Sequence, residues 1–146
     1  MKTLTALLSL ILIFTSPLAF SRDTKYMMSI QEAMESPDFK AKLDPNISFY
    51  FGDQSHPEVI QRFGNFSTNK KTNAFNKSDK EACEWVLLSA LLTMQDRARK
   101  EGGNAIINTA SYYKKNKVES NSEYECHAGA FVAGVALTGE VVKLAK

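Results

Sequence analysis

The longest regular pattern of apolar residues runs through residues 82–94 and has helical character. Ser78 and Glu81 stand just before it with the spacing of a capping box, in which each side chain binds the backbone N–H of the other residue. Gly102 and Gly103 follow it, and glycine is the residue that most often ends a helix in a left-handed conformation. The pattern therefore predicts one long helix that ends at the two glycines.

Four segments have the character of strands. Residues 47–51 and 59–68 are dominated by β-branched and aromatic residues, residues 104–113 follow the helix directly, and residues 124–144 can be extended over their whole length. We therefore predict an α+β domain with a small, mostly antiparallel sheet of about four strands in ββαββ order. The long helix is expected to pack on one face of this sheet.

One face of the last segment carries unusually small side chains if the segment is extended. Small side chains let a helix approach a sheet closely, so we expect the helix on that face. The residues of this face are Tyr124, Cys126, Ala128, Ala130, Val132, Gly134 and Ala136. The pattern leaves open whether residues 124–144 form one long strand or a hairpin that turns at Thr138 and Gly139.

The N-terminus has the features of a secretory signal peptide. Lys2 precedes an apolar run over residues 4–20, and the small residues Ala19 and Ser21 predict cleavage after Ser21. An uncleaved membrane anchor is the alternative, which Pro17 within the run disfavours. We thus predict a signal peptide at residues 1–21, an N-terminal arm with short helical turns at 22–45, and a single α+β domain at 46–146. A bacterial periplasmic or secreted location follows, with no stable membrane anchor after cleavage.

The charge of the chain argues against nucleic acid as a partner. Residues 22–146 hold 17 basic and 16 acidic side chains, so a basic groove that would follow a phosphate backbone is not indicated. The chain also lacks the sequence patterns of a phosphate-binding loop, a nucleophile elbow, a zinc-protease helix and a dinucleotide-binding turn. The sequence therefore predicts neither an enzyme nor a cofactor.

Two cysteines, Cys83 and Cys126, remain in the mature chain. An even number of cysteines in an exported protein favours a disulfide, and neither cysteine belongs to a zinc-binding pair. Cys126 lies on the face where we expect the helix, and Cys83 lies near the start of that helix. The disulfide between them would stabilise the domain by roughly 4 kcal/mol in the chain-entropy model.

His127 and His56 are candidate metal ligands, and with a free cysteine they could also form a nucleophile–base pair. If Cys126 is in a disulfide, it has no thiolate for either role. Structural packing is the simpler interpretation of His127, since no ligand spacing surrounds it. The aromatic pairs of the strands, such as Tyr112 and Tyr113, are interpreted as core residues in the same way.

The helix, the run RKEGGNAII and the Ala/Gly-rich last segment resemble two bacterial families, the RcsF-like envelope-stress lipoproteins and the YbjQ-type domains, whose suggested role is metal binding. The resemblance covers about residues 47–144, and its most specific part is formed by Ala98, Gly103, Asn104, Ala105 and Ile106. It implies a compact α+β domain, and in the RcsF-like case a disulfide-supported periplasmic module that binds other proteins. The chain departs from that family because it lacks the lipid-attachment cysteine and has two cysteines instead of two disulfides.

These observations predict a non-enzymatic exported module with one disulfide. It would bind an unknown protein or another component of the cell envelope. The alternative is a periplasmic metal-binding protein that uses His127 and His56, with or without free cysteines.

Overall fold

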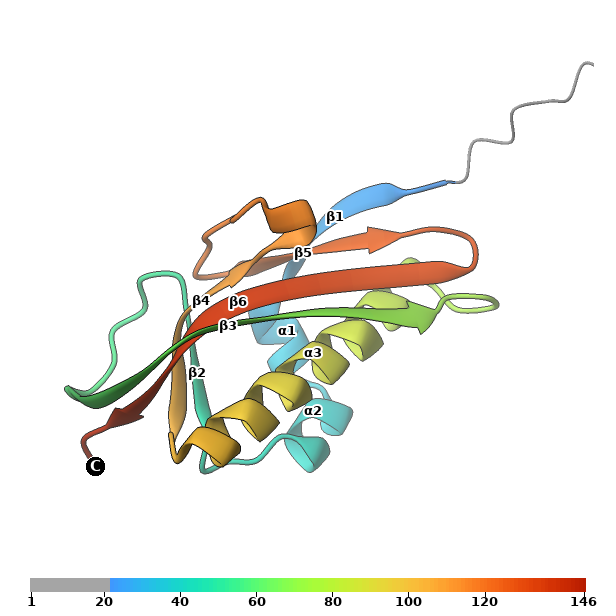
Figure 1. Cartoon of the computed structure of the whole chain (residues 1–146). Helices are drawn as coiled ribbons and strands as arrows, with labels where there is room; N and C mark the ends of the chain where they lie inside the picture. The colour runs from blue at the N-terminus through green and yellow to red at the C-terminus, as the bar shows by residue number, and fades with distance from the viewer. Residues whose placement is uncertain (1–21) are drawn as a thin grey trace, which may run out of the picture.

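The structure is a computed structural model and describes residues 22–146. The predicted signal peptide at 1–21 lies outside the described residues. Figure 1 shows one long helix lying along one side of a curled sheet, with two short helices beside it. The predicted α+β class with one long helix is confirmed.

The long helix α3 (Asp79–Glu101) begins and ends where the sequence predicts. The hydroxyl of Ser78 accepts a hydrogen bond from the N–H of Glu81 at 3.0 Å, which satisfies one of the free donors of the first turn. Gly102 ends the helix with a φ of 84°. This left-handed conformation costs glycine little, because it has no Cβ.

The sheet is mixed and has six strands, two more than predicted. Strand β6 is its centre: β3 pairs with one edge of β6, while β5 and then β4 share the other edge. Strand β1 continues the sheet beyond β5, and β2 pairs in parallel with β4. The strands are β1 (Thr24–Ser29), β2 (Ser48–Phe51), β3 (Val59–Asn73), β4 (Ala105–Ser111), β5 (Glu123–Ala128) and β6 (Val132–Leu144).

The predicted ββαββ order with about four strands is therefore wrong in two places. The segment around Tyr26 forms the edge strand β1, although its mixed polar composition gave no clear strand pattern. Residues 124–144 form a hairpin, and its turn lies at residues 129–131 and not at Thr138 and Gly139. The turn contains three residues, so each residue of β6 lies on the opposite face of the sheet from the one that a continuous strand predicts. Ala133, Val135 and Leu137 face the helix, and not Val132, Gly134 and Ala136 as predicted.

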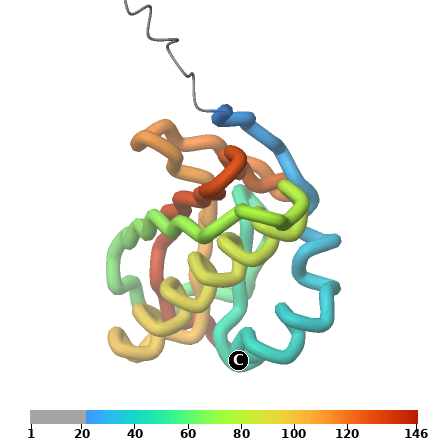
Figure 2. The backbone as a smooth tube through the Cα atoms, turned by 90° about the vertical axis from the view of Figure 1, so that its right-hand side faces the viewer, coloured from blue at the N-terminus to red at the C-terminus, as the bar shows by residue number. Residues whose placement is uncertain are grey.

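The N-terminal arm packs against the domain. It contains α1 (Ile30–Glu35) and α2 (Pro37–Lys42), where helical turns were predicted, in addition to β1. Figure 2 shows this segment (blue to cyan) along one side of α3. The side chain of Gln95, only 2% exposed, binds the backbone N–H and C=O of Asp44 and the C=O of Ile47, each at 2.9 Å. This buried amide ties the end of the arm to α3.

The predicted disulfide between Cys83 and Cys126 is confirmed. It joins the N-terminal part of α3 to β5, and both cysteines are fully buried. The core around it lies between α3 and the sheet and includes Leu87, Leu91 and Tyr124. Within residues 22–146, no helix has both the length and the hydropathy needed to cross a membrane.

Candidate binding site around His127

Strand β5 separates its side chains onto two faces. Tyr124, Cys126 and Ala128 point into the helix-side core, as the alternation of a strand requires. Glu125 and His127 therefore lie together on the opposite face, where they meet the chain that follows β4. This arrangement places a carboxylate and an imidazole side by side away from the disulfide.

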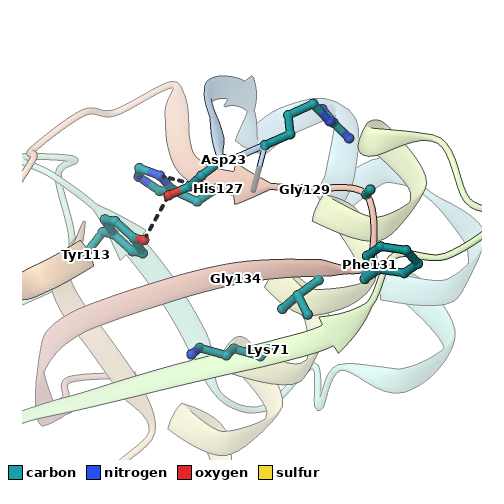
Figure 3. Close-up of a pocket in the computed structure, with 10 residues that line it drawn as sticks. Asp23, Lys71, Tyr113, His127, Gly129, Phe131 and Gly134 are labelled. Carbon is teal, nitrogen blue, oxygen red and sulfur yellow. Dashed lines mark hydrogen bonds and ion pairs between the residues drawn. The ribbon is translucent and has the colours of Figure 1, made fainter. Parts of the chain in front are cut away.

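The second element of the site is the short 3₁₀ turn η1 (Tyr113–Lys115). Lys114 and Lys115 have φ values of 50° and 63°, so the backbone reverses sharply there. The turn brings the ring of Tyr113 onto His127, with the ring centroids 3.5 Å apart and the planes inclined by 14°. Figure 3 shows the two stacked rings.

His127 lies between two carboxylates. Its Nε2 lies 2.6 Å from Oε1 of Glu125, a side chain that is 6% exposed. A carboxylate can only accept, so Nε2–H is the donor. Its Nδ1 lies 3.4 Å from Oδ1 of Asp23, the residue before β1. The Tyr113 hydroxyl donates to the same carboxylate at 3.5 Å, and the pKa of Tyr113 is raised by burial and by the charge of Asp23. His127 thus connects three separate parts of the chain.

His127, Tyr113 and Asp23 form one wall of a cavity of about 340 Å³. Gly134, Val132 and Phe131 contribute its apolar side, and Lys71 of β3 reaches it from below in Figure 3. The turn between β5 and β6 lines the cavity next to Arg22. A Cβ on Gly129 would lie 2.5 Å from the carbonyl oxygen of Arg22, so this close approach requires glycine.

Arg22 is fixed by a second carboxylate at the same end of the molecule. Its guanidinium makes two hydrogen bonds of 2.9 Å to Asp79, the first residue of α3, and the Tyr26 hydroxyl donates to the same carboxylate. Hydrogen bonds from Arg22 and Tyr26 lower the pKa of Asp79 to about 2. The helix N-terminus also favours a negative charge there.

The low pKa of Asp79 predicts acid sensitivity. Because its folded pKa of about 2 is below the ordinary value of 3.8, the Asp79 contribution to stability is fully present above pH 4. It is lost as the pH falls through 2. Arg22 is 45% exposed, so solvent screening keeps the contribution small. In thermal unfolding between pH 5 and pH 2, Asp79→Asn should start less stable and lose less stability than the wild type. If the melting temperatures of the variant and the wild type fall equally between pH 5 and pH 2, Asp79 does not have a lowered pKa in the folded state.

The structure does not bring the predicted metal ligands together. His56 packs edge-on against Tyr50, whereas His127 stacks on Tyr113, and both cysteines are in the disulfide. In the described part of the chain, no group of three or more His, Cys, Asp or Glu side chains could hold a metal ion. Sequence analysis missed Glu125 and Asp23. The spacing of two residues between Glu125 and His127 was the available signal for the first of them.

A pair of exposed aromatic rings adjoins the cavity. Phe131, in the turn between β5 and β6, stacks on Phe75, in the loop between β3 and α3, with centroids 5.7 Å apart. The N–H of Ala74 donates to the carbonyl of Phe131 at 2.8 Å, which joins the two loops. Phe75 is 56% exposed, Phe131 66% and Val132 50%. We call these three residues the aromatic tip.

Comparison of the chain with protein-family models, with curated proteins and with solved structures finds no match.

Proposed function

We propose that this protein is a non-enzymatic binding module, exported to the bacterial periplasm or beyond and stabilised by its disulfide. It acts at the cell envelope without a cofactor, and it contacts its partner through the aromatic tip. The observation that carries this proposal is the exposed stack of Phe75 on Phe131.

An exposed aromatic pair is informative because burial of a phenylalanine side chain is favourable by about 1.5–3 kcal/mol. The chain has a core that holds other phenylalanines, such as Phe39 and Phe51, at 2% and 4% exposure. Phe75 and Phe131 instead face solvent from two loops that are joined by a hydrogen bond. Large apolar side chains gathered at one exposed place are typical of a surface that another molecule covers.

Export is supported by two independent features. The N-terminal pattern is that of a signal peptide, and a disulfide persists in oxidising compartments. The resemblance to RcsF-like domains agrees with a periplasmic role in binding. The metal-binding alternative has less support, because the cysteines that it would use are bonded to each other.

The first test expresses the full chain in a bacterium and measures the intact mass of the product after thiol alkylation without reductant. We expect a periplasmic species that begins at Arg22, carries no alkyl group and is two hydrogens lighter than the reduced chain. Alkylated cysteines, or a product confined to the cytoplasm, would contradict export and the disulfide together.

The second test places a photo-crosslinking amino acid at Phe131 in the living cell. Ile60, which is 62% exposed at the other end of β3, is the matched control position. We expect adducts at position 131, with a protein or with lipid, and few at position 60. Equal labelling, or none at either position, would contradict a contact surface at the aromatic tip.

A further inference from the structure

We propose that the aromatic tip docks on the surface of a phospholipid bilayer, with an anionic leaflet preferred. This inference rests on the proposed function and names its partner: a lipid surface instead of a folded protein. Three features lead to it, namely the shape of the tip, its charge and the position of Arg22, which follows the apolar run of residues 4–20.

The shape of the tip suits insertion better than protein docking. Figure 1 shows the β3–α3 loop and the β5–β6 turn at the same end of the molecule. Its three apolar residues are too few for a specific protein interface, which buries about 1,200–2,000 Å² in total. A small group of apolar side chains on projecting loops can instead enter the boundary between headgroups and acyl chains, a layer about 5–10 Å deep.

The charge carried by the two loops of the tip has one sign. Residues 70–78 and 128–134, which form the two loops and the adjoining strand ends, contain three lysines and no acidic residue. The lysines are Lys70, Lys71 and Lys77. Two carboxylates lie beside the loops: Asp79 is paired with Arg22, and Asp23, which lines the same cavity as Phe131, accepts a hydrogen bond from Tyr113. Lysines that surround exposed aromatic rings complement a surface of anionic headgroups.

Arg22 lies at the same end of the molecule as the aromatic tip. The carbonyl of Arg22 lies against Gly129, in the turn that carries Phe131. In the sequence, only Ser21 separates Arg22 from the apolar run of residues 4–20. Whenever that run is inserted in a membrane, during export or as a retained anchor, the aromatic tip is therefore held close to the bilayer. Such tethering raises the effective concentration of a weak contact.

The test uses tryptophan as a depth probe in the full chain as the cell delivers it, processed or not. Trp85→Phe removes the native tryptophan, and a new one is introduced either by Phe131→Trp or by Ile60→Trp. Vesicles contain phosphatidylethanolamine and phosphatidylglycerol at about 7:3, and a second set is pure phosphatidylcholine; both carry doxyl-labelled lipid. Because Phe131 and Ile60 are 66% and 62% exposed, both variants are expected to fold.

We expect tryptophan at position 131 to shift to the blue and to lose at least half of its emission to the doxyl lipid. Tryptophan at position 60 should change little in the same vesicles. In the processed protein, addition of Phe75→Ser should weaken vesicle binding about tenfold, and phosphatidylcholine vesicles should bind more weakly than anionic ones. Replacement of the three lysines by glutamine should remove that preference.

Equal quenching at positions 131 and 60, or none at position 131, would overturn the lipid inference. The crosslinking experiment then separates the two proposals. Protein adducts at position 131 without quenching would refute lipid docking and leave the binding module intact, whereas absence of both would refute both.

Discussion

Replacement of Cys83 and Cys126 together by alanine is expected to lower the free energy of unfolding by about 4 kcal/mol. The two cysteines are 43 residues apart in the sequence, so the disulfide removes much of the freedom of the unfolded chain. In a domain of this length the melting temperature should fall by roughly 12–20 °C. Thermal and urea unfolding of the variant and the wild type measure the effect.

Reduction provides the matched control for this prediction. The wild type in strong reductant should become nearly as unstable as the double alanine variant, whereas the variant itself should not respond to reductant. Both cysteines are fully buried in the core between α3 and β5, so reduction is expected to require partial unfolding. A variant that unfolds at the wild-type temperature would show that the disulfide does not stabilise the domain.

The features that the sequence predicts well are those determined by neighbouring residues. The limits of α3 depend on Ser78 and Gly102, and each acts through contacts within a few residues. The pairing of Cys83 with Cys126 also followed from local information, because only two cysteines were available and Cys126 lies on the helix side of its strand.

The hairpin of β5 and β6 could not be predicted in the same way. Most of β6 is buried on both faces, because one face meets α3 and part of the other forms a second small core with Ala105 and Ile107 of β4. A strand buried on both faces has no alternation of polar and apolar residues. Gly129 and Ala130 fit a strand as well as a turn, so the two faces of β6 were predicted one residue out, whereas those of β5 were predicted correctly.

The site around His127 depends on contacts between distant parts of the chain. Asp23 and Tyr113 approach each other across 90 residues, and they do so because β1 pairs with β5 and because the backbone reverses at Lys114. Lysine is an unusual residue at a positive φ, so the sequence gives no signal for this reversal. The sequence shows that these residue types are present, but it does not show that they contact one another in the fold.

His127→Ala is expected to lower the free energy of unfolding by about 3 kcal/mol. The substitution leaves Glu125, a side chain that is only 6% exposed, without its hydrogen-bond donor. Loss of the donor to a buried acceptor costs about 1–3 kcal/mol, and the upper end applies because His127 is itself only 13% exposed. The stack on Tyr113 is lost as well. Urea unfolding at pH 7 measures the change.

A double-mutant cycle identifies the cause. Glu125→Ala combined with His127→Ala leaves no buried acceptor without a donor. The double variant should therefore lose clearly less free energy of unfolding than the sum of the losses of the two single variants. Tyr113→Phe keeps the stacked ring and removes only the 3.5 Å hydrogen bond to Asp23, so it should cost less than 1 kcal/mol. If His127→Ala also costs less than 1 kcal/mol, the buried pair does not stabilise the fold.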